Sequence, residues 1–320
     1  MLLATVLVIF GLILLVLGAD RFVEGASSLA AKFNISQLAI GLTVVAFGTS
    51  APELVVNSFA SYQGNFDIVF ANIIGSNNFN LFIILGLAGI ITPMTVQSGT
   101  AWREIPFSLF CVILLFILVN DAMLFGSSSS GLNIADGAIL FLFFIVFLFY
   151  VYKQLKNDII QEQSEKKILS NIKIIIYIIF GLAALIYGGK LVVDNAVKLA
   201  TVLGMSEKVI GMTIIAAGTS LPELATSIVA AIRKNSDIAI GNIVGSNIFN
   251  ILLIFSISTF VNPSDYNISF NTDLYILAGG TLFLILAMYT GKIKKLDRWE
   301  AALLLIFYVA YTTYAVINEV

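Results

Sequence analysis

Two glutamates, Glu53 and Glu223, lie deep inside apolar segments, whereas the other acidic residues fall in loops or near the expected ends of helices. An ionised carboxylate in hydrocarbon is costly, and such residues usually mark ion pathways or binding sites. No lysine or arginine lies at a comparable depth to neutralise them. We therefore expect an external cation at these glutamates, with a permanently protonated pair as the alternative.

The residues before Glu53 are those that a hard cation prefers. Thr49 and Ser50 precede it by four and three residues, so two hydroxyls and a carboxylate share one helix face. Pro52 cannot donate a backbone hydrogen bond, and its ring clashes with the carbonyl four residues earlier. The resulting kink should expose backbone carbonyls such as that of Ala46. The same elements recur 170 residues later as Ala216, Thr219, Ser220, Pro222 and Glu223.

A row of asparagine and serine side chains follows each glutamate, at intervals of four residues. The rows are Asn72, Ser76 and Asn80, and Asn242, Ser246 and Asn250. The first asparagine of each row is nearer the helix start, where interhelical hydrogen bonding and ion contact both stay open. We expect the serine and the last asparagine of each row to face the glutamates. Asn77 and Asn247 are expected to pack or to cap backbone groups.

All of these donors are oxygen atoms. Calcium takes about 6–8 oxygen ligands in flexible geometry, and sodium accepts the same hard ligands, whereas zinc, copper and iron are disfavoured. Two negative charges neutralise one Ca²⁺ or two Na⁺. A site with two negative charges can hold one Ca²⁺ or two Na⁺, but not both full loads at once. The two ions therefore compete for the site, and this competition permits exchange.

An ungapped internal repeat relates the two groups of residues. Residues 40–54 and 210–224 are identical at 10 of 15 positions, and residues 67–80 and 237–250 at 9 of 14, both at an offset of 170. Five expected membrane crossings separate equivalent points, so the two halves must have opposite orientations. Inverted repeats of this kind are typical of secondary transporters with a site at the membrane midplane.

The composition indicates that lipid surrounds these elements. Of 320 residues, 17 are Lys or Arg and 19 are Asp or Glu, and 59% are hydrophobic, whereas soluble domains carry about 25% charged residues. Ten apolar stretches are expected to be helices. They lie near residues 2–19, 36–62, 68–92, 105–120, 134–152, 172–193, 207–232, 238–261, 273–290 and 300–317.

We therefore predict an all-α polytopic membrane protein with ten transmembrane helices in two inverted-topology five-helix repeats. The repeats span residues 1–152 and 172–320, and residues 153–171 form a cytoplasmic connector. Short cytoplasmic loops carry excess Lys and Arg. Placing both termini outside puts fourteen of these residues inside and three outside, which favours that orientation in the plasma membrane.

Several functions are excluded by residue content. A net charge of −2 gives no basic face for nucleic acid. The absence of histidine removes imidazole relays and most catalytic triads. An intramembrane hydrolase using Ser50 or Ser220 would lack a base, so we predict no enzymatic activity. A passive channel is disfavoured because it needs a continuous pore, whereas a buried site formed by two inverted halves is better suited to enclosing an ion. Cys111 is expected to be a packing residue.

The motifs Gly48–Glu53 with Gly75–Asn77, and Gly218–Glu223 with Gly245–Asn247, resemble the alpha-repeats of the cation/calcium exchanger superfamily. The chain is most similar to prokaryotic sodium/calcium exchangers. The resemblance implies alternating access, in which Na⁺ entry drives Ca²⁺ out and the first and sixth helices slide against the other eight. It implies no cofactor beyond the transported ions, lipid and small cations as the partners, and function as a monomer.

The resemblance also implies which residues bind the ions. They are Ala46, Thr49, Ser50, Glu53, Ser76, Asn80, Ala216, Thr219, Ser220, Glu223, Ser246 and Asn250. Close relatives often have Asp at the position of Asn250, and potassium-dependent branches keep an acid there. Asn250 therefore argues against a potassium requirement and leaves the sodium stoichiometry open. Proton-coupled exchange is the alternative, because Glu53 and Glu223 could themselves carry protons.

Overall fold

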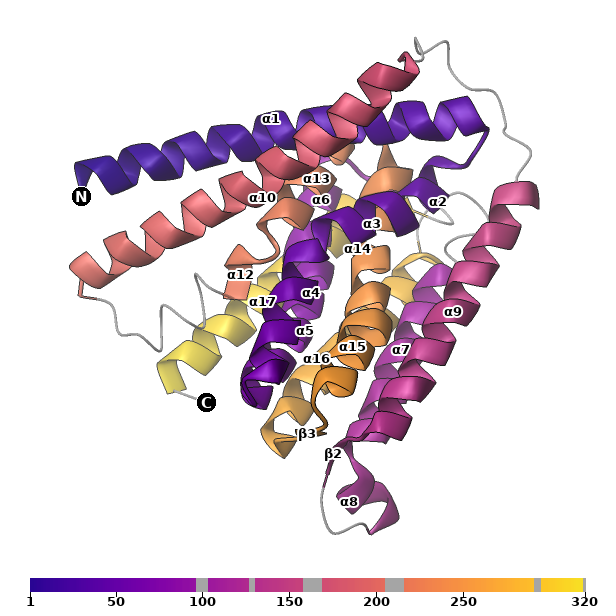
Figure 1. Cartoon of the computed structure of the whole chain (residues 1–320), viewed down its shortest axis with the longest axis vertical. Coiled ribbons are helices and arrows are strands. Elements are labelled where there is room, and N and C mark those ends of the chain that lie inside the picture. The colour runs from indigo at the N-terminus through magenta and orange to yellow at the C-terminus, as the bar shows by residue number, and fades with distance from the viewer. Residues whose placement is uncertain (96–102, 127–129, 158–168, 205–215, 291–294, 319–320) are drawn as a thin grey trace.

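A computed structural model describes the chain except for residues 96–102, 127–129, 158–168, 205–215, 291–294 and 319–320. The described residues form ten successive helical segments, several of them interrupted, and Figure 1 shows how they are arranged. The first five are α1 (Leu2–Phe33), α2 to α4 (Gln37–Ile40, π-helical turn η1 Gly41–Val45, Ala46–Thr49, Ala51–Tyr62), α5 and α6 (Phe66–Asn78, π-helical turn η2 Phe79–Ile84, Leu85–Ile91), α7 (Glu104–Val119) and α9 (Ile134–Asn157). The second five are α10 (Asn171–Val202), α12 and α13 (Ala216–Gly218, Leu221–Ile232), α14 and α15 (Ser236–Phe249, π-helical turn η4 Asn250–Ile254, Phe255–Val261), α16 (Asn271–Ala287) and α17 (Arg298–Asn318).

The helices differ in whether they are long and apolar enough to cross a bilayer. Within the described residues, six helical spans are long and apolar enough to cross a membrane, and the pair α2–α4, bent by 47° at its break, makes a seventh. Helices α7 and α13 are shorter apolar helices. The order of the segments confirms the predicted all-α polytopic architecture.

Short strand pairs join the halves in a symmetric way. Strand β1 (Met94–Thr95), after α6, pairs with β4 (Lys295–Leu296), before α17. Strand β2 (Gly131–Leu132), before α9, pairs with β3 (Ser264–Asp265), after α15. The third helix of each half is thus tied to the last helix of the other half. Two further short helices lie in the connections that the structure describes, α8 (Asp121–Phe125) and η5 (Ile268–Phe270).

Helices α1 and α10 are longer than the sequence predicted. Each has 32 residues, whereas the apolar runs ended at residues 19 and 193. Helix α1 continues to Phe33 and ends at Asn34, whose left-handed backbone (φ 53°) is a common helix stop. The two helices lie side by side and cross the remaining bundle obliquely (Figure 1).

The charged second half of α1 packs on the core instead of forming a loop. Arg233, just after α13, donates from Nε to Asp20 Oδ1 at 2.9 Å, and its Nη2 lies 3.4 Å from Glu24 Oε2. Arg21 also bonds Glu24 at 3.3 Å. Charges ended the predicted apolar run, but the helix continues because these charges find partners.

Glycines bring the backbones of α1 and α10 into contact. A Cβ atom on Gly181 would lie 2.7 Å from the Phe22 nitrogen and 2.8 Å from the Gly18 oxygen. Close approach through small residues is typical of membrane helix pairs. The contact therefore depends on the missing side chain at Gly181.

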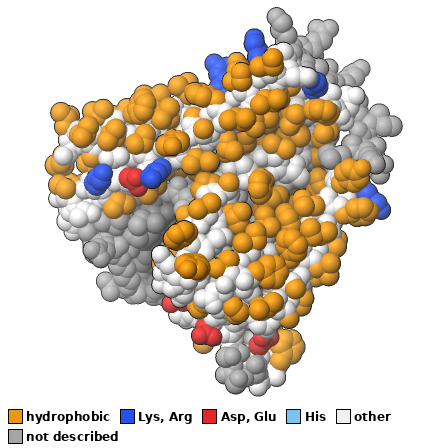
Figure 2. Space-filling model, viewed as in Figure 1, with side chains coloured by type: hydrophobic (Ala, Val, Ile, Leu, Met, Phe, Trp, Pro, Cys, Tyr) orange, Lys and Arg blue, Asp and Glu red, His pale blue; other side chains and the backbone are white. Residues whose placement is uncertain are grey.

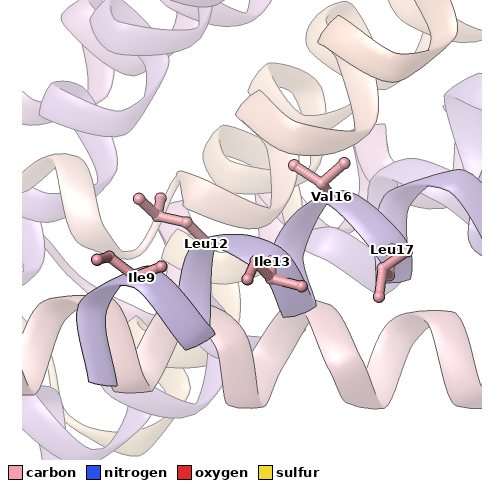
Figure 3. A pocket seen from close by; sticks show the side chains of 5 residues that line it. All are labelled: Ile9, Leu12, Ile13, Val16 and Leu17. Carbon is pink, nitrogen blue, oxygen red and sulfur yellow. The ribbon is translucent and has the colours of Figure 1, made fainter. Parts of the chain in front are cut away.

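The outer surface is apolar, as lipid contact requires. Hydrophobic side chains cover much of the face in Figure 2. Lys and Arg lie along its upper and right edges, Asp and Glu along its lower edge, and a small group of both signs lies toward the left. The shallow hollow in Figure 3 is lined by exposed side chains of α1 alone. Those residues are Ile9, Leu12, Ile13, Val16 and Leu17. They form a surface for hydrocarbon and lie apart from the polar interior.

We predict that Gly181→Ala destabilises the protein, because the added methyl has no room against backbone atoms. Overpacking of this kind costs about 1–3 kcal/mol, which should lower the thermal unfolding midpoint in detergent. Gly279→Ala in α16 is the matched control, since its Cβ would meet no atom within 4 Å. The control should unfold at or above the wild-type temperature, because alanine favours helix over glycine by roughly 0.5–1 kcal/mol. Equal midpoints for both variants would contradict the packing.

Candidate ion-binding site

Each glutamate stands at a helix break. Ser50 leaves the helical conformation (ψ 4°), and α4 begins after it with Pro52 and Glu53 in its first turn. Ser220 (ψ 8°) and Glu223 stand in the same relation to α13. The unpaired amides at a helix N-terminus favour negative charge. The predicted proline kink therefore exists, and it aims a helix start at each carboxylate.

The two carboxylates are buried together at the meeting of the halves. Glu53 and Glu223 are each 1% exposed. The Ser50 hydroxyl donates to Glu223 Oε1 at 2.9 Å, across 173 residues of sequence. The second oxygen of each carboxylate is buried and has no hydrogen-bond partner among the described residues.

The last asparagine of each row enters a π-helical turn. Asn80 lies in η2 and Asn250 opens η4. Single π-helical turns inside α-helices are frequent at functional sites. Both side chains are 1% exposed, and each Oδ1 has no partner in the described part of the chain.

The site thus contains buried oxygens that the described protein leaves unsatisfied. These six atoms are Glu53 Oε2, Glu223 Oε2, Asn80 Oδ1, Asn250 Oδ1, Ser220 Oγ and Ser246 Oγ. Buried polar atoms normally have partners, so a cluster of orphaned acceptors fits a cation. No group of three or more His, Cys, Asp or Glu side chains occurs in the described ranges. The candidate site therefore depends on neutral oxygens beside its two carboxylates.

The first asparagine of each row, left open by the sequence, bonds across the halves. Thr49 Oγ1 donates to Asn242 Oδ1 at 3.0 Å, and Thr219 Oγ1 donates to Asn72 Oδ1 at 3.0 Å. Ser76 Oγ also lies 3.5 Å from Asn72 Oδ1. The Thr49 hydroxyl also lies 3.1 Å from the Val45 carbonyl. A hydroxyl has one hydrogen to donate and two lone pairs that accept, so each threonine oxygen can also accept or bind a cation.

The two alanines, Ala46 and Ala216, were predicted to contribute backbone carbonyls to the ion. The Ala46 carbonyl accepts from the Ser50 amide at 2.9 Å and also lies 3.3 Å from the Thr49 hydroxyl. Ala216 is the first residue of α12, and its side chain lies outside the described residues.

One side of the site is sealed and the other is more open. Thr49 and Asn242 are 0% exposed, whereas Thr219 and Asn72 are partly exposed. A Cβ on Gly245 would lie 2.8 Å from Ala46 Cβ, but a Cβ on the equivalent Gly75 would meet no atom of the described residues within 4 Å. The halves are thus similar in sequence and different in access.

The sequence did not predict three further buried acids, Glu104, Asp136 and Glu300. They lie at helix starts, and each has a protein partner. Tyr150 donates to Glu104 Oε1 at 2.5 Å, the Asn133 amide to Asp136 Oδ2 at 2.9 Å, and the Asp297 amide to Glu300 Oε2 at 2.7 Å. Burial alone therefore does not mark an ion site. The unpaired oxygens distinguish Glu53 and Glu223 from Asp136 and Glu300.

Two inverted halves of five helices that meet around buried carboxylates define a polytopic membrane transporter. The chain matches the family described as sodium/calcium exchanger protein over residues 3–153 and 173–317, and it belongs to that family.

Relatives and solved structures agree over almost the whole chain. It is 38% identical to the putative antiporter CaxA of Alkalimonas amylolytica, over 97% of this chain and 98% of the relative. It is 31% identical to the sodium/calcium exchanger MaX1 of Methanosarcina acetivorans, over 95% and 96%. A structure of the sodium-calcium exchanger NCX_Mj soaked with Na⁺ and Sr²⁺ matches with a TM-score of 0.82 at 34% identity, over 97% of both chains.

We predict that Ca²⁺ raises the unfolding temperature of the purified protein and that Glu53→Gln or Glu223→Gln removes this shift. A ligand at 100 times its dissociation constant stabilises by about 2.7 kcal/mol, and each variant deletes half of the buried negative charge. Glu300→Gln is the matched control, because Glu300 is also 1% exposed but partnered elsewhere. A full Ca²⁺ shift in both site variants would contradict the assignment.

Proposed function

We propose that this protein is a secondary active antiporter that exchanges Na⁺ for Ca²⁺ across the membrane by alternating access. The observation that carries the proposal is the pair Glu53 and Glu223, buried where the halves meet and surrounded by unpaired oxygens. Such a site attracts Ca²⁺ or Na⁺ by charge, and only one loading fits at a time. The names of the relatives MaX1 and NCX_Mj support the same pair of ions.

Twelve residues form the proposed ion site, with oxygen atoms as ligands. The carboxylates supply charge, hydroxyls and amide oxygens supply neutral ligands, and alanine contributes its backbone carbonyl. The set is Ala46, Thr49, Ser50, Glu53, Ser76, Asn80, Ala216, Thr219, Ser220, Glu223, Ser246 and Asn250. Because Asn80 and Asn250 are both neutral, the proposed exchange needs no K⁺.

The proposed orientation places both termini outside the plasma membrane. The distribution of Lys and Arg, fourteen against three, supports it. In this orientation α5 starts at the outer side, so the more exposed residues Asn72 and Thr219 lie toward the outside and Asn242 toward the cytoplasm. The proposed conformation is therefore open outward.

The proposed domains are residues 1–152 and 172–320, joined by a cytoplasmic connector, 153–171. The separate family matches, 3–153 and 173–317, support this division. Helix α9 extends to Asn157, into the proposed connector, and residues 158–168 lie outside the described part. Since both halves of the site come from one chain, we propose that the monomer is the working unit, with lipid around it.

We predict that vesicles containing the protein and loaded with Na⁺ take up Ca²⁺ when diluted into Na⁺-free buffer, because outward Na⁺ flow drives the exchange. Radioactive Ca²⁺ uptake measures this. Glu223→Gln should abolish the uptake, and Glu300→Gln should retain it.

The same vesicles distinguish the alternatives. Imposed K⁺ gradients should drive no uptake. Uptake driven by a pH gradient alone, without Na⁺, would replace this proposal with proton-coupled exchange, and a unitary conductance in planar bilayers would replace it with a channel.

We predict that a cysteine at Gln63 reacts with an impermeant thiol reagent added outside intact cells, whereas one at Ser170 does not. Both positions are exposed, and the proposed topology places them on opposite sides. The background is Cys111→Ala, since Cys111 is the chain's one cysteine and is buried. Gel-shift labelling before and after permeabilisation is the measurement. Labelling of the Ser170→Cys variant in intact cells would reverse the topology.

A further inference from the structure

Two asparagines that are not among the proposed ion ligands connect the halves at the centre of the protein. Asn77 on α5 is 0% exposed and Asn247 on α14 is 4% exposed. Each donates its Nδ2 to the backbone carbonyl of the other at 3.2 Å. The two residues therefore form a reciprocal pair, whereas the sequence predicted only packing or capping groups.

The same pair holds the two ligand asparagines. Asn80 Nδ2 donates to Asn247 Oδ1 at 3.0 Å, and Asn250 Nδ2 donates to Asn77 Oδ1 at 3.0 Å. Each bond joins a residue of one half to a residue of the other. The amide groups of all four asparagines thus form one network across the repeat interface.

The chemistry of the network determines which way each amide faces. A backbone carbonyl can only accept, so Asn77 must turn its NH₂ toward the Asn247 carbonyl. Its Oδ1 then faces Asn250 and must meet a donor, and the NH₂ of Asn250 supplies it. The Asn250 oxygen is left pointing away, and it is buried without a partner among the described residues. The same steps from Asn247 direct the oxygen of Asn80.

We propose that Asn77 and Asn247 are positioning residues, each of which fixes the ligand amide of the opposite half so that it presents only oxygen to the ion. The inference rests on the proposed function. The terminal torsion of a free asparagine is roughly two-fold. Without its partner, an amide can turn its NH₂, the positive end, toward a cation and weaken binding.

The test measures Ca²⁺ binding, exchange and stability in purified full-length protein. Asn77→Ala and Asn247→Ala remove the positioning groups. Asn120→Ala is the matched control, because Asn120 and Asn271 form another buried reciprocal amide pair, at 3.0 and 2.8 Å, away from the site. The readouts are equilibrium binding of radioactive Ca²⁺, the KM and maximal rate of Na⁺-driven uptake, and the unfolding temperature.

Asn77→Ala and Asn247→Ala should raise the Ca²⁺ dissociation constant and KM by roughly five- to ten-fold, the range of one lost hydrogen bond. Asn120→Ala should leave both constants unchanged at a comparable loss of unfolding temperature. Unchanged Ca²⁺ affinity in folded Asn77→Ala and Asn247→Ala would overturn the inference. Equal weakening by Asn120→Ala would also overturn it, since the effect would then be general.

Double variants test the crossed pattern. Asn77→Ala should add little to Asn250→Ala, because both break the same bond, but it should multiply the effect of Asn80→Ala, whose bond it leaves intact. The reverse pattern would contradict the network.

If Asn77→Ala fails to fold, Asn77→Ser replaces it with a smaller disturbance of packing. Wild-type protein that neither binds nor exchanges Ca²⁺ would overturn the proposed function and this inference with it, whereas normal wild-type exchange with unaffected variants would overturn the inference alone.

Discussion

The structure depends on holding two carboxylates, Glu53 and Glu223, inside a low-dielectric interior without an ion pair to any Lys or Arg that the structure describes. Burying such groups is unfavourable unless charge and hydrogen bonds compensate. The helix breaks at Ser50 and Ser220 offer part of this compensation, because each aims the start of a helix at a carboxylate. Each half contributes one carboxylate and part of the neutral oxygens. Neither half alone builds the site, which explains why the halves interlock through strands and central amides instead of packing as separate domains.

The sequence predicted the parts that depend on local chemistry. Glu53 and Glu223 could be found because a charge in a long apolar run is conspicuous, and the repeat placed them in equivalent positions. The ends of α1 and α10 could not be found in this way. Hydropathy indicates where the lipid-facing part of a helix ends, but the helical hydrogen bonding continues beyond that point, in α1 as far as the left-handed residue Asn34. Asp20 interrupts the apolar pattern, but its partner Arg233 lies 213 residues away.

The centre of the site was harder to predict for a related reason. The π-helical turns at η2 and η4 change the direction of side chains that a regular helix would present, and no residue pattern in the rows indicates them. The pairing of Asn77 with Asn247 is a contact between halves. Spacing along one helix could suggest that these asparagines were polar and buried, but not which amide each one would meet. The buried acid Glu300 shows the converse limit, because the Thr290 hydroxyl and the Asp297 amide donate to its two oxygens and make it structural.

The glycine contact between α1 and α10 has a mechanical consequence. The two helices come from halves of opposite orientation, and their backbones touch at Gly18 and Gly181 with no side chain between them. Two helices in such close contact should move as one rigid body. Displacement of this rigid body against the bundle would loosen the contacts near one membrane face while tightening those near the other. A single small motion would therefore open the ion site toward one side of the membrane while closing it toward the other.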